Sequence, residues 1–399
     1  MAADPLESLR RSLERLPMGR RRILRPFRPV SPAGLHPLGS GCDNNTSEPL
    51  EARPLLDLAS NDYLGLSQHP RLRQAACDAI ATDGVGAGAS RLVSGSRQVH
   101  SELEGRLARW LGRERVLLFP SGFQANLAAV LALADRHSLV LADRLIHHSL
   151  LVGVRASGAR LRRFQHNDLA DLERHLARAG ADGSQRRLVV LSESLFSMEG
   201  SSPDLPALAS LCQRFGALLV VDEAHALGVL GPGGRGLAHG LEGVSLVSGT
   251  FGKAFGSGGA FLAADALIGD WLLQSSGPFR YSTALAPPLA AAALAALDLL
   301  EQQPHQGAEL LERADRWRRS LEEAGWPPLP GPGPILPLTV GSDGTALALQ
   351  GHLEAEGLLT VAIRPPTVPE GTARLRLVLR RDLPSGSLER LVGALGRWR

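Results

Sequence analysis

The sequence predicts an α/β protein with a mostly parallel sheet that is covered by helices. From residue 101 onward, segments of helical periodicity alternate with short apolar runs. These runs lack the polar alternation of half-exposed strands, which is typical of parallel strands buried on both faces. At 399 residues, 44% hydrophobic and 21% charged, the chain is long enough for one or two globular domains.

The first 54 residues are expected to form an N-terminal arm. Residues 1 to about 35 predict a basic helix followed by an extended segment, and the polar stretch 36–51 predicts a loop or insertion. Residues 10–28 contain eight arginines and a single acid, Glu14. This arm could therefore face an acidic substrate or partner, and a solvated basic helix is an equal alternative.

A large domain is predicted over residues 55–285. It starts with a short strand at 55–59, and a helix at 101–112 is expected to open with a capping box of Ser101 and Glu104. The strands expected after it are 116–119, 139–141, 188–191, 218–221 and 244–247. The helices expected between them are 124–134, 169–179 and 204–215. Ligands of such sheets bind at the carboxyl ends of the strands, so the residues that follow these runs are candidates for a site.

A smaller α+β domain is predicted over residues 286–399. The apolar run Leu285 to Leu297 contains two prolines and ends at Asp298, which indicates a buried helix at 287–302 and not a membrane span. The further elements expected are helices at 306–324, 344–356 and 387–398, and strands at 335–340, 359–363 and 374–379.

Composition argues against several classes of protein. A net charge of +3 is too small to predict a nucleic-acid-binding protein. No apolar stretch follows the N-terminal arginines, so no signal peptide is expected. Cys42, Cys77 and Cys212 have neither metal-ligand spacing nor the pattern of a disulfide framework, which favours a reducing cytoplasm.

Lys253 is the only lysine among the 43 Lys and Arg residues of the chain. A lysine amine, unlike a guanidinium, can lose its proton and act as a nucleophile or base. The chemistry that most specifically needs it is a Schiff base with a carbonyl compound, above all pyridoxal phosphate. The alternative is a solvated surface lysine. The apolar run before it and the glycines around it favour a site.

Asp222 ends the apolar run 218–221, and His225 follows three residues later. A carboxylate at this point could pair with a protonated pyridine nitrogen and so tune pyridoxal phosphate. A helix N-cap is an open alternative for Asp222. A metal site is disfavoured, because no third ligand is near in sequence.

Backbone amides and hydroxyls offer a place for a phosphate group. Gly122 and Phe123 follow an apolar run and open a helix, where free amides can bind an anion. The hydroxyls of Ser197, Thr250 and Thr283 could reach the same group.

Two further side chains are candidates for cofactor and substrate contacts. His147 could stack on an aromatic cofactor, although a lone histidine is more often structural and His148 lies beside it. Arg364 precedes Pro365 and Pro366, which stiffen the backbone around it. Its planar guanidinium group is suited to binding a carboxylate. A surface arginine is the alternative.

Together these motifs resemble the α-oxoamine synthases, which are pyridoxal-phosphate enzymes of the aspartate-aminotransferase fold, fold type I. The resemblance runs from about residue 55 to the end, and it is greatest for the branch that makes 8-amino-7-oxononanoate in biotin synthesis. The sequence departs from the family at 36–51 and at Ala226-Leu227, where relatives often have Gly-Thr or Ser. The tracts that carry the likeness are Ser60 to Leu66, Phe196 to Gly200, Arg280 to Thr283, Ile363 to Pro369 and Gly371 to Arg376.

The resemblance implies a role for each candidate residue. Lys253 would bind the cofactor and then move the substrate proton, with Asp222 on the ring nitrogen and His225 on the phenolic oxygen. The other implied cofactor contacts are His147 stacked on the ring, Gly122 and Phe123 through their backbone, and Ser197, Thr250 and Thr283 through their hydroxyls. The implied substrate contacts are Arg364 on the amino-acid carboxylate, Thr367 along the acyl chain, His147, and Arg20, for which Arg21 or Arg22 is an alternative.

The implied reaction joins L-alanine to a pimeloyl thioester, carried by coenzyme A or an acyl carrier protein, with release of carbon dioxide and the thiol. The resemblance also implies a homodimer. One alternative is another α-oxoamine synthase, of the glycine C-acetyltransferase, 5-aminolevulinate synthase or serine palmitoyltransferase type. The other is a non-catalytic binding or regulatory protein of the same fold.

Overall fold

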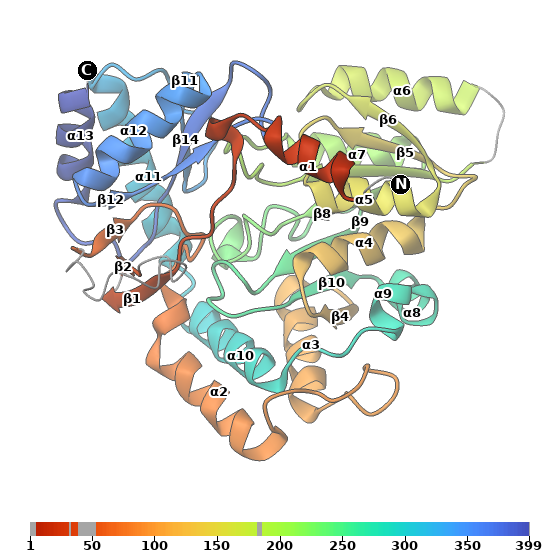
Figure 1. Cartoon of the computed structure of the whole chain (residues 1–399). Coiled ribbons are helices and arrows are strands. Elements are labelled where there is room, and N and C mark those ends of the chain that lie inside the picture. Colours follow the sequence, from red (N-terminus) through yellow and green to blue (C-terminus); the bar gives the residue numbers. More distant parts are fainter. Residues whose placement is uncertain (1–4, 32, 39–52, 182–185, 399) are drawn as a thin grey trace. The chain divides into compact units, whose positions relative to one another are not determined.

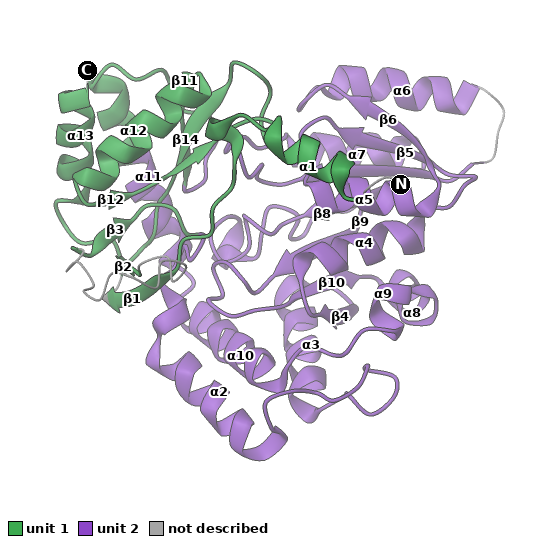
Figure 2. Cartoon of the chain, viewed as in Figure 1, with its two compact units in different colours: residues 1–60, 316–330, 335–399 green, residues 61–315, 331–334 purple. Residues whose placement is uncertain are grey.

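The computed structural model describes residues 5–31, 33–38, 53–181 and 186–398, which divide into two compact units (Figures 1 and 2). Unit 1 comprises residues 1–60, 316–330 and 335–399, and unit 2 comprises residues 61–315 and 331–334. The boundaries between the units differ from the predicted domain boundaries, which lay between residues 54 and 55 and between residues 285 and 286. Helix α10 (Pro287–Gln302) packs on α2 (Pro70–Asp83) and therefore belongs to unit 2. Strand β3 (Leu55–Asp57) pairs with β12 (Leu358–Leu359) and therefore belongs to unit 1.

Unit 2 contains a seven-stranded sheet with the order β4-β10-β9-β8-β7-β5-β6. Within this sheet β10 runs antiparallel to its neighbours β4 and β9, whereas the other described pairs are parallel, so the predicted mostly parallel sheet is confirmed. The bounds are β4 Arg115–Phe119, β5 Leu139–Asp143, β6 Arg160–Phe164, β7 Leu188–Glu193, β8 Leu218–Asp222, β9 Val244–Thr250 and β10 Ala260–Ala264.

Helices cover both faces of this sheet (Figure 1). Right-handed crossovers place α4 (Gly122–Leu133) and α5 (His148–Ser157) on one face. The same rule places α6 (Leu169–Ala181) and α7 (Leu205–Arg214) on the other. Helices α4 and α5 approach closely, since a Cβ at Gly153 would lie 2.8 Å from Val130. The remaining helices of unit 2 are α3 Gln98–Leu111, α8 Ala266–Ser275, α9 Gly277–Arg280, η2 Leu66–Gln68 and η3 Pro232–Gly234.

The structure corrects three details of unit 2. Strand β6 was not expected, because Arg160, Arg162 and Arg163 interrupt any apolar run at this edge of the sheet. Strand β10 was likewise absent from the predicted set. The capping box of Ser101 and Glu104 is wrong, because α3 begins at Gln98.

The carboxylate that was assigned to that capping box has another role. The backbone N–H of Arg97 donates to Nδ1 of His100 at 3.0 Å, at the true start of α3. Glu104 lies inside the helix, where it accepts hydrogen bonds from Arg91 and from the backbone of Leu118. Glu104 therefore ties the loop before α3 to strand β4.

Unit 1 contains a four-stranded sheet, β1-β2-β3-β12, and a three-stranded sheet, β11-β14-β13. The predicted strand 359–363 is therefore two strands in two sheets, β12 and β13 (Val361–Ile363). Of the predicted polar loop, 36–38 are described and 39–51 lie outside the described residues, as does Cys42. The other elements are α1 Glu7–Glu14, η1 Met18–Arg20, β1 Phe27–Ser31, β2 Gly34–Pro37, β11 Ile335–Gly341, β14 Ala373–Val378, α12 Asp343–Ala355 and α13 Ser387–Trp398, with α11 (Gln306–Glu323) crossing the boundary between the units.

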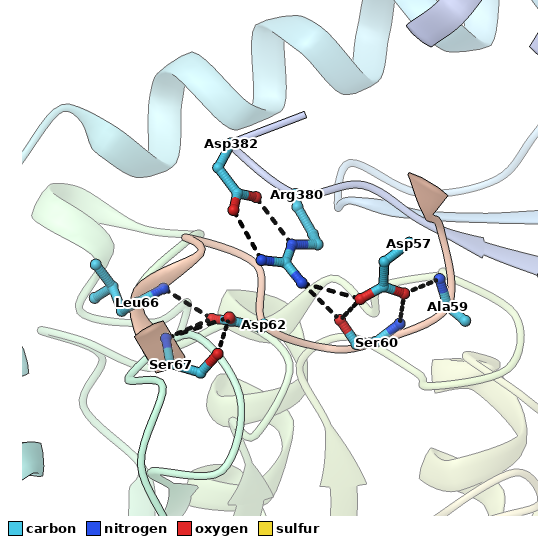
Figure 3. A network of polar contacts seen from close by, with 8 residues as sticks. All are labelled: Asp57, Ala59, Ser60, Asp62, Leu66, Ser67, Arg380 and Asp382. Carbon is cyan, nitrogen blue, oxygen red and sulfur yellow. Dashed lines mark hydrogen bonds and ion pairs between the residues drawn. The ribbon is translucent and has the colours of Figure 1, made fainter. Parts of the chain in front are cut away.

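A buried ion pair fixes the chain after β3 (Figure 3). In unit 1, Arg380 donates to Asp57 at 2.9 Å and to Asp382 at 2.8 Å. Asp57 also accepts the backbone amides of Ala59 and Ser60, both at 3.0 Å. In unit 2, Asp62 accepts the backbone amide of Leu66 at 2.9 Å. Side-chain oxygens thus fix the turns on either side of Tyr63.

No helix in the described part of the chain combines the length and apolar character that a bilayer span requires.

Candidate functional site

A pocket of about 200 Å³ lies at the carboxyl ends of the strands of unit 2. This is the edge at which parallel α/β sheets bind ligands. Residues from several strand ends and helix starts meet there, although they are far apart in sequence. The pocket is lined by Gly122, Phe123, Asn126, His147, Glu193, Asp222, Ala224, His225, Ser248, Gly249, Thr250 and Lys253.

Lys253 lies in the pocket with its amine 2.8 Å from Nε2 of His225. The other ring nitrogen of His225, Nδ1, lies 2.5 Å from the hydroxyl of Tyr63. His225 is buried, and Tyr63 is fully buried. The amine is thus held by a histidine that is itself held by a buried phenol, and the alternative of a solvated surface lysine is wrong.

Asp222 ends β8 and is 6% exposed. Its Oδ2 accepts a hydrogen bond of 2.7 Å from the side-chain amide of Asn126, and its Oδ1 accepts the backbone N–H of Ala224 at 2.9 Å. Turns and no α-helix follow the strand here, so the N-cap alternative is wrong. Among the described residues no group of His, Cys, Asp and Glu could hold a metal ion.

Two more carboxyl groups are buried beside Asp222. Glu193 on β7 is the register partner of Asp222 on β8, and its Oε1 has no hydrogen-bond partner among the described residues. The pKa of Glu193 is raised well above its ordinary value, mainly by burial and secondly by the neighbouring charge of Asp222. Burial raises the pKa of Glu223 to about 7, although the backbone amides of Leu237 and Ala238 donate to its carboxyl group.

His147, and not its neighbour His148, lines the pocket. It is the N-cap of α5, where its Nδ1 lies 2.7 Å from Oγ of Ser149. The same hydroxyl accepts a hydrogen bond of 2.9 Å from Asn126, so Asn126 links His147 to Asp222. Desolvation by the surrounding protein lowers the pKa of His147, which favours a neutral imidazole.

The start of α4 presents backbone donors to the pocket. Ser121 caps this helix by accepting the amide of Gln124 at 3.3 Å. No acceptor for the amides of Gly122 and Phe123 is found in the described part of the chain, as expected for the first positions of a helix. The hydroxyl of Thr250, at the end of β9, donates to the carbonyl of Gly259 at 3.0 Å.

Ser197 and Thr283 are not among the residues that line the pocket. Ser197 is half-buried in the turn after β7. Thr283 is exposed and forms an isolated antiparallel bridge with Ser90. The structure thus brings seven of the predicted residues together in the pocket and leaves these two outside its lining.

Arg20, Arg364 and Thr367 belong to unit 1. Arg364 donates to the carbonyl of Gly19, and its buried Nε has no acceptor among the described residues. The pKa of Arg364 is lowered, mainly by burial and secondly by the neighbouring charge of Arg22. Arg20 pairs with Asp343 at 2.8 Å and with Glu370 at 2.7 Å, whereas Thr367 is exposed.

The residues in or beside this pocket that sequence reasoning missed include Glu193, Asn126 and Tyr63. Glu193 lies two positions after the end of the predicted strand 188–191. The rule that identified Asp222, that ligands bind at the carboxyl ends of strands, could therefore have identified Glu193 as well. Asn126 is a polar residue within a mostly apolar helix, which is a weaker signal. Tyr63 is one of only two tyrosines, but nothing in the sequence connects it with His225.

Comparison with known proteins agrees with this geometry. The family model for aminotransferase class I and II matches residues 53–395. The 8-amino-7-oxononanoate synthase of Chromohalobacter salexigens is 45% identical over 86% of this chain and 89% of its own length. That of Geobacter sulfurreducens is 43% identical over 87% of this chain and 89% of its own length.

Solved structures give the same answer for the fold. Serine palmitoyltransferase from S. paucimobilis, with bound PLP and myriocin, has a TM-score of 0.86 at 25% identity and covers 94% of this chain and 92% of its own. The 8-amino-7-oxononanoate synthase of Francisella tularensis has a TM-score of 0.73 at 28% identity, with coverage of 86% and 96%. The chain therefore belongs to the class I and II aminotransferase family of pyridoxal-phosphate-dependent enzymes, and within it to the group of its 8-amino-7-oxononanoate synthase relatives.

Proposed function

We propose that this enzyme condenses L-alanine with a pimeloyl thioester to give 8-amino-7-oxononanoate, carbon dioxide and the free thiol, in biotin biosynthesis. The observation that carries the proposal is the amine of Lys253, held at 2.8 Å from His225 in the pocket that Asp222 lines. The names of the relatives support the choice of product. The Arg364-Pro365-Pro366-Thr367 tract supports it as well.

The pocket fits pyridoxal phosphate. A cofactor with an aldehyde, a basic ring nitrogen and a phosphate needs an amine, an acid and backbone donors, and the lining offers all three. Lys253 would bind the aldehyde, and Asp222 would hold the ring nitrogen. Gly122, Phe123 and Thr250 lie where they could take the phosphate. When bound, the cofactor supplies an electron-withdrawing ring that stabilises negative charge on the substrate α-carbon.

Lys253 is proposed to take the α-proton of alanine and later to return a proton to the product. A lysine amine suits this role because it can exist in both protonation states, and His225 beside it can accept from or donate to it. Asp222 is oriented by the hydrogen bonds that it accepts from Asn126 and Ala224. His147 is proposed to lie against the cofactor ring, and Ser197 and Thr283 to contact the cofactor.

Arg364 is proposed to bind the alanine carboxylate. Its buried Nε lacks an acceptor among the described residues, and a buried donor of this kind favours an anionic ligand. Arg20 and Thr367 are proposed as further substrate contacts. Arg20 already has two carboxylate partners in Asp343 and Glu370, so it would act on the substrate only after exchanging one of them.

Product analysis tests this proposal. Purified enzyme is mixed with alanine and either pimeloyl-CoA or a pimeloyl-acyl carrier protein, and the product is identified by mass spectrometry. Glycine and serine, with acetyl, succinyl and palmitoyl thioesters, test the other α-oxoamine synthase reactions in parallel. We expect 8-amino-7-oxononanoate when the amino acid is alanine, and not when it is glycine or serine. The Lys253→Ala variant should form no product. Repeated turnover by Lys253→Ala would refute the role of Lys253.

We further propose a homodimer in the cytoplasm. The exposed leucines of residues 5–16, which are 42% to 63% exposed, offer an apolar surface for a second copy. Cys77 and Cys212 are free thiols, which suits a reducing compartment. The arginine-rich segment 10–28 supports an acidic acyl carrier as the thioester donor. Light scattering during size-exclusion chromatography would measure the mass, and a monomer would contradict the dimer.

A further inference from the structure

We propose that Tyr63 is a positioning residue for Lys253: its hydroxyl keeps the imidazole of His225 hydrogen-bonded on both nitrogens whether the lysine amine is charged or neutral. The inference rests on the proposed function only for its catalytic consequence. The hydrogen bonding itself is a property of the chain and can be measured without substrate or cofactor.

Tyr63, His225 and Lys253 form a continuous chain of polar contacts in unit 2. The distance from Oη of Tyr63 to Nδ1 of His225 is 2.5 Å, and that from Nε2 of His225 to Nζ of Lys253 is 2.8 Å. A second acceptor for Tyr63, Oδ1 of Asn61, lies 3.4 Å from Oη. Tyr63 is fully buried and His225 is 6% exposed, so bulk water cannot easily replace either contact.

The charged amine fixes one direction of these hydrogen bonds. An ammonium group donates and never accepts, so Nε2 of His225 must be the acceptor. A neutral imidazole then carries its proton on Nδ1, and this N–H donates to Oη of Tyr63. The phenol O–H then donates toward Oδ1 of Asn61.

The neutral amine allows the opposite direction. Its lone pair can accept from Nε2–H, and Nδ1 then needs a donor, which the phenol O–H provides. A hydroxyl can act in both ways, whereas the ring of phenylalanine can do neither. Tyr63 therefore suits a site in which the partner of His225 gains and loses a proton during each turnover.

Removing the hydroxyl should affect the two states unequally. In the charged state it would leave a buried N–H without its acceptor, and in the neutral state only a lone pair without its donor. Buried N–H groups without partners are the rarer and less tolerated case. The charged state should therefore be disfavoured. The loss of about one neutral hydrogen bond predicts a pKa of Lys253 lower by about 0.5 to 1.

Competitive acetylation tests this inference on the full-length, cofactor-free protein. Trace acetic anhydride is applied over a range of pH, and acetylation of the peptide that contains Lys253 is measured by mass spectrometry. Because the chain has one lysine, the side-chain signal has a single origin. Tyr63→Phe should lower the pKa of Lys253. The control is Tyr281→Phe, which alters the only other tyrosine of the sequence and should leave this pKa unchanged, because Tyr281 is 79% exposed.

The other titratable groups that line the pocket with Lys253 and His225 are Asp222, Glu193 and His147, and they are the same in both variants. A difference between the variants therefore reports the hydroxyl. Equal titration of Lys253 in wild type and Tyr63→Phe would overturn the inference. A Tyr63→Phe variant whose unfolding free energy falls while Lys253 titrates as in wild type would equally overturn it, because the role would then be structural.

A second measurement keeps the test valid if Tyr63→Phe folds poorly. Growth of the Tyr281→Phe protein with 3-fluorotyrosine places one fluorinated phenol at position 63 without loss of the hydroxyl. Fluorination makes the phenol a weaker acceptor and a stronger donor, and both effects favour the neutral amine. The pKa of Lys253 should fall, and no change would contradict the inference. Failure of the proposed condensation would leave these readouts intact, so the two proposals fail separately.

Discussion

Asn126 and Asp222 are joined by a hydrogen bond of 2.7 Å from the side-chain amide to Oδ2 of the acid. Helix α4 thereby orients a carboxylate that ends strand β8, and the two residues are 96 positions apart in sequence. The amide also donates to Ser149, which contacts His147. One residue that sequence patterns do not identify thus aligns two that they do.

Asn126→Ala should weaken both stability and cofactor binding. A hydrogen bond to a charged group contributes roughly 1.5 to 3 kcal/mol, and its loss leaves a buried carboxylate oxygen without a partner. Urea unfolding of the cofactor-free protein should show a loss of this size. The matched control is Gln74→Ala on α2, whose amide donates to Asp78 at the same 2.7 Å on the surface. An equal loss in both variants would contradict the importance of burial.

Glu223→Gln should change how stability depends on pH. Burial raises the pKa of Glu223 from 4.5 to about 7, so the folded protein retains a proton that the unfolded chain releases. The protonated acid therefore contributes stability that is complete below pH 4.5 and is lost as the pH rises to about 7. This contribution is roughly 3 kcal/mol, and glutamine cannot make it.

The measurement is the unfolding free energy of both proteins at several values between pH 4.5 and 7. Glutamine offers one acceptor to the two backbone amides of Leu237 and Ala238, so the variant should be less stable at low pH. The difference should shrink as the pH rises. Glu193 titrates in the same direction, but it is present in both proteins and cancels. The exposed Glu242→Gln should leave the slope unchanged.

Much of this site could be predicted from sequence because the carboxyl ends of parallel strands meet at one edge. Asp222 and Thr250 each end a strand, and Gly122 follows one after a short turn. A rule about strand ends therefore predicts their proximity without any knowledge of distances. Lys253 was identified in another way, by being the sole lysine of the chain.

The remaining parts depend on packing that the sequence does not encode locally. Tyr63 reaches His225 across 162 positions, and no periodicity connects them. The unit boundary after residue 60 follows from the pairing of β3 with β12, two short strands about 300 positions apart. Strand β6 is rich in arginine and owes its conformation to pairing with β5 rather than to an apolar run.

His147→Ala should weaken cofactor binding more than His148→Ala. His147 lines the pocket, whereas His148 is the first residue of α5 and does not. Aromatic stacking contributes about 0.5 to 1.5 kcal/mol, so the dissociation constant for pyridoxal phosphate should rise about 2- to 12-fold. Absorbance titration of the cofactor-free protein measures it. His147→Phe should recover most of the affinity, and equal effects at 147 and 148 would rule out stacking by His147.

Arg380→Leu should be among the most destabilising single changes in unit 1. The guanidinium and the Asp57 carboxylate are 9% and 1% exposed, and Arg380 donates to Asp57 at 2.9 Å (Figure 3). Removal of the arginine leaves a buried carboxylate without its cationic partner, which typically lowers the unfolding free energy by about 3 to 5 kcal/mol. Arg397→Leu is the matched control, because its pair with Glu356 has the same kind of geometry but is largely solvated and should matter little. The double variant Arg380→Leu with Asp57→Asn should regain part of the loss, since the unpaired charge is then gone. If the double variant is as unstable as Arg380→Leu, the loss arises from packing of the arginine stem and not from the buried carboxylate.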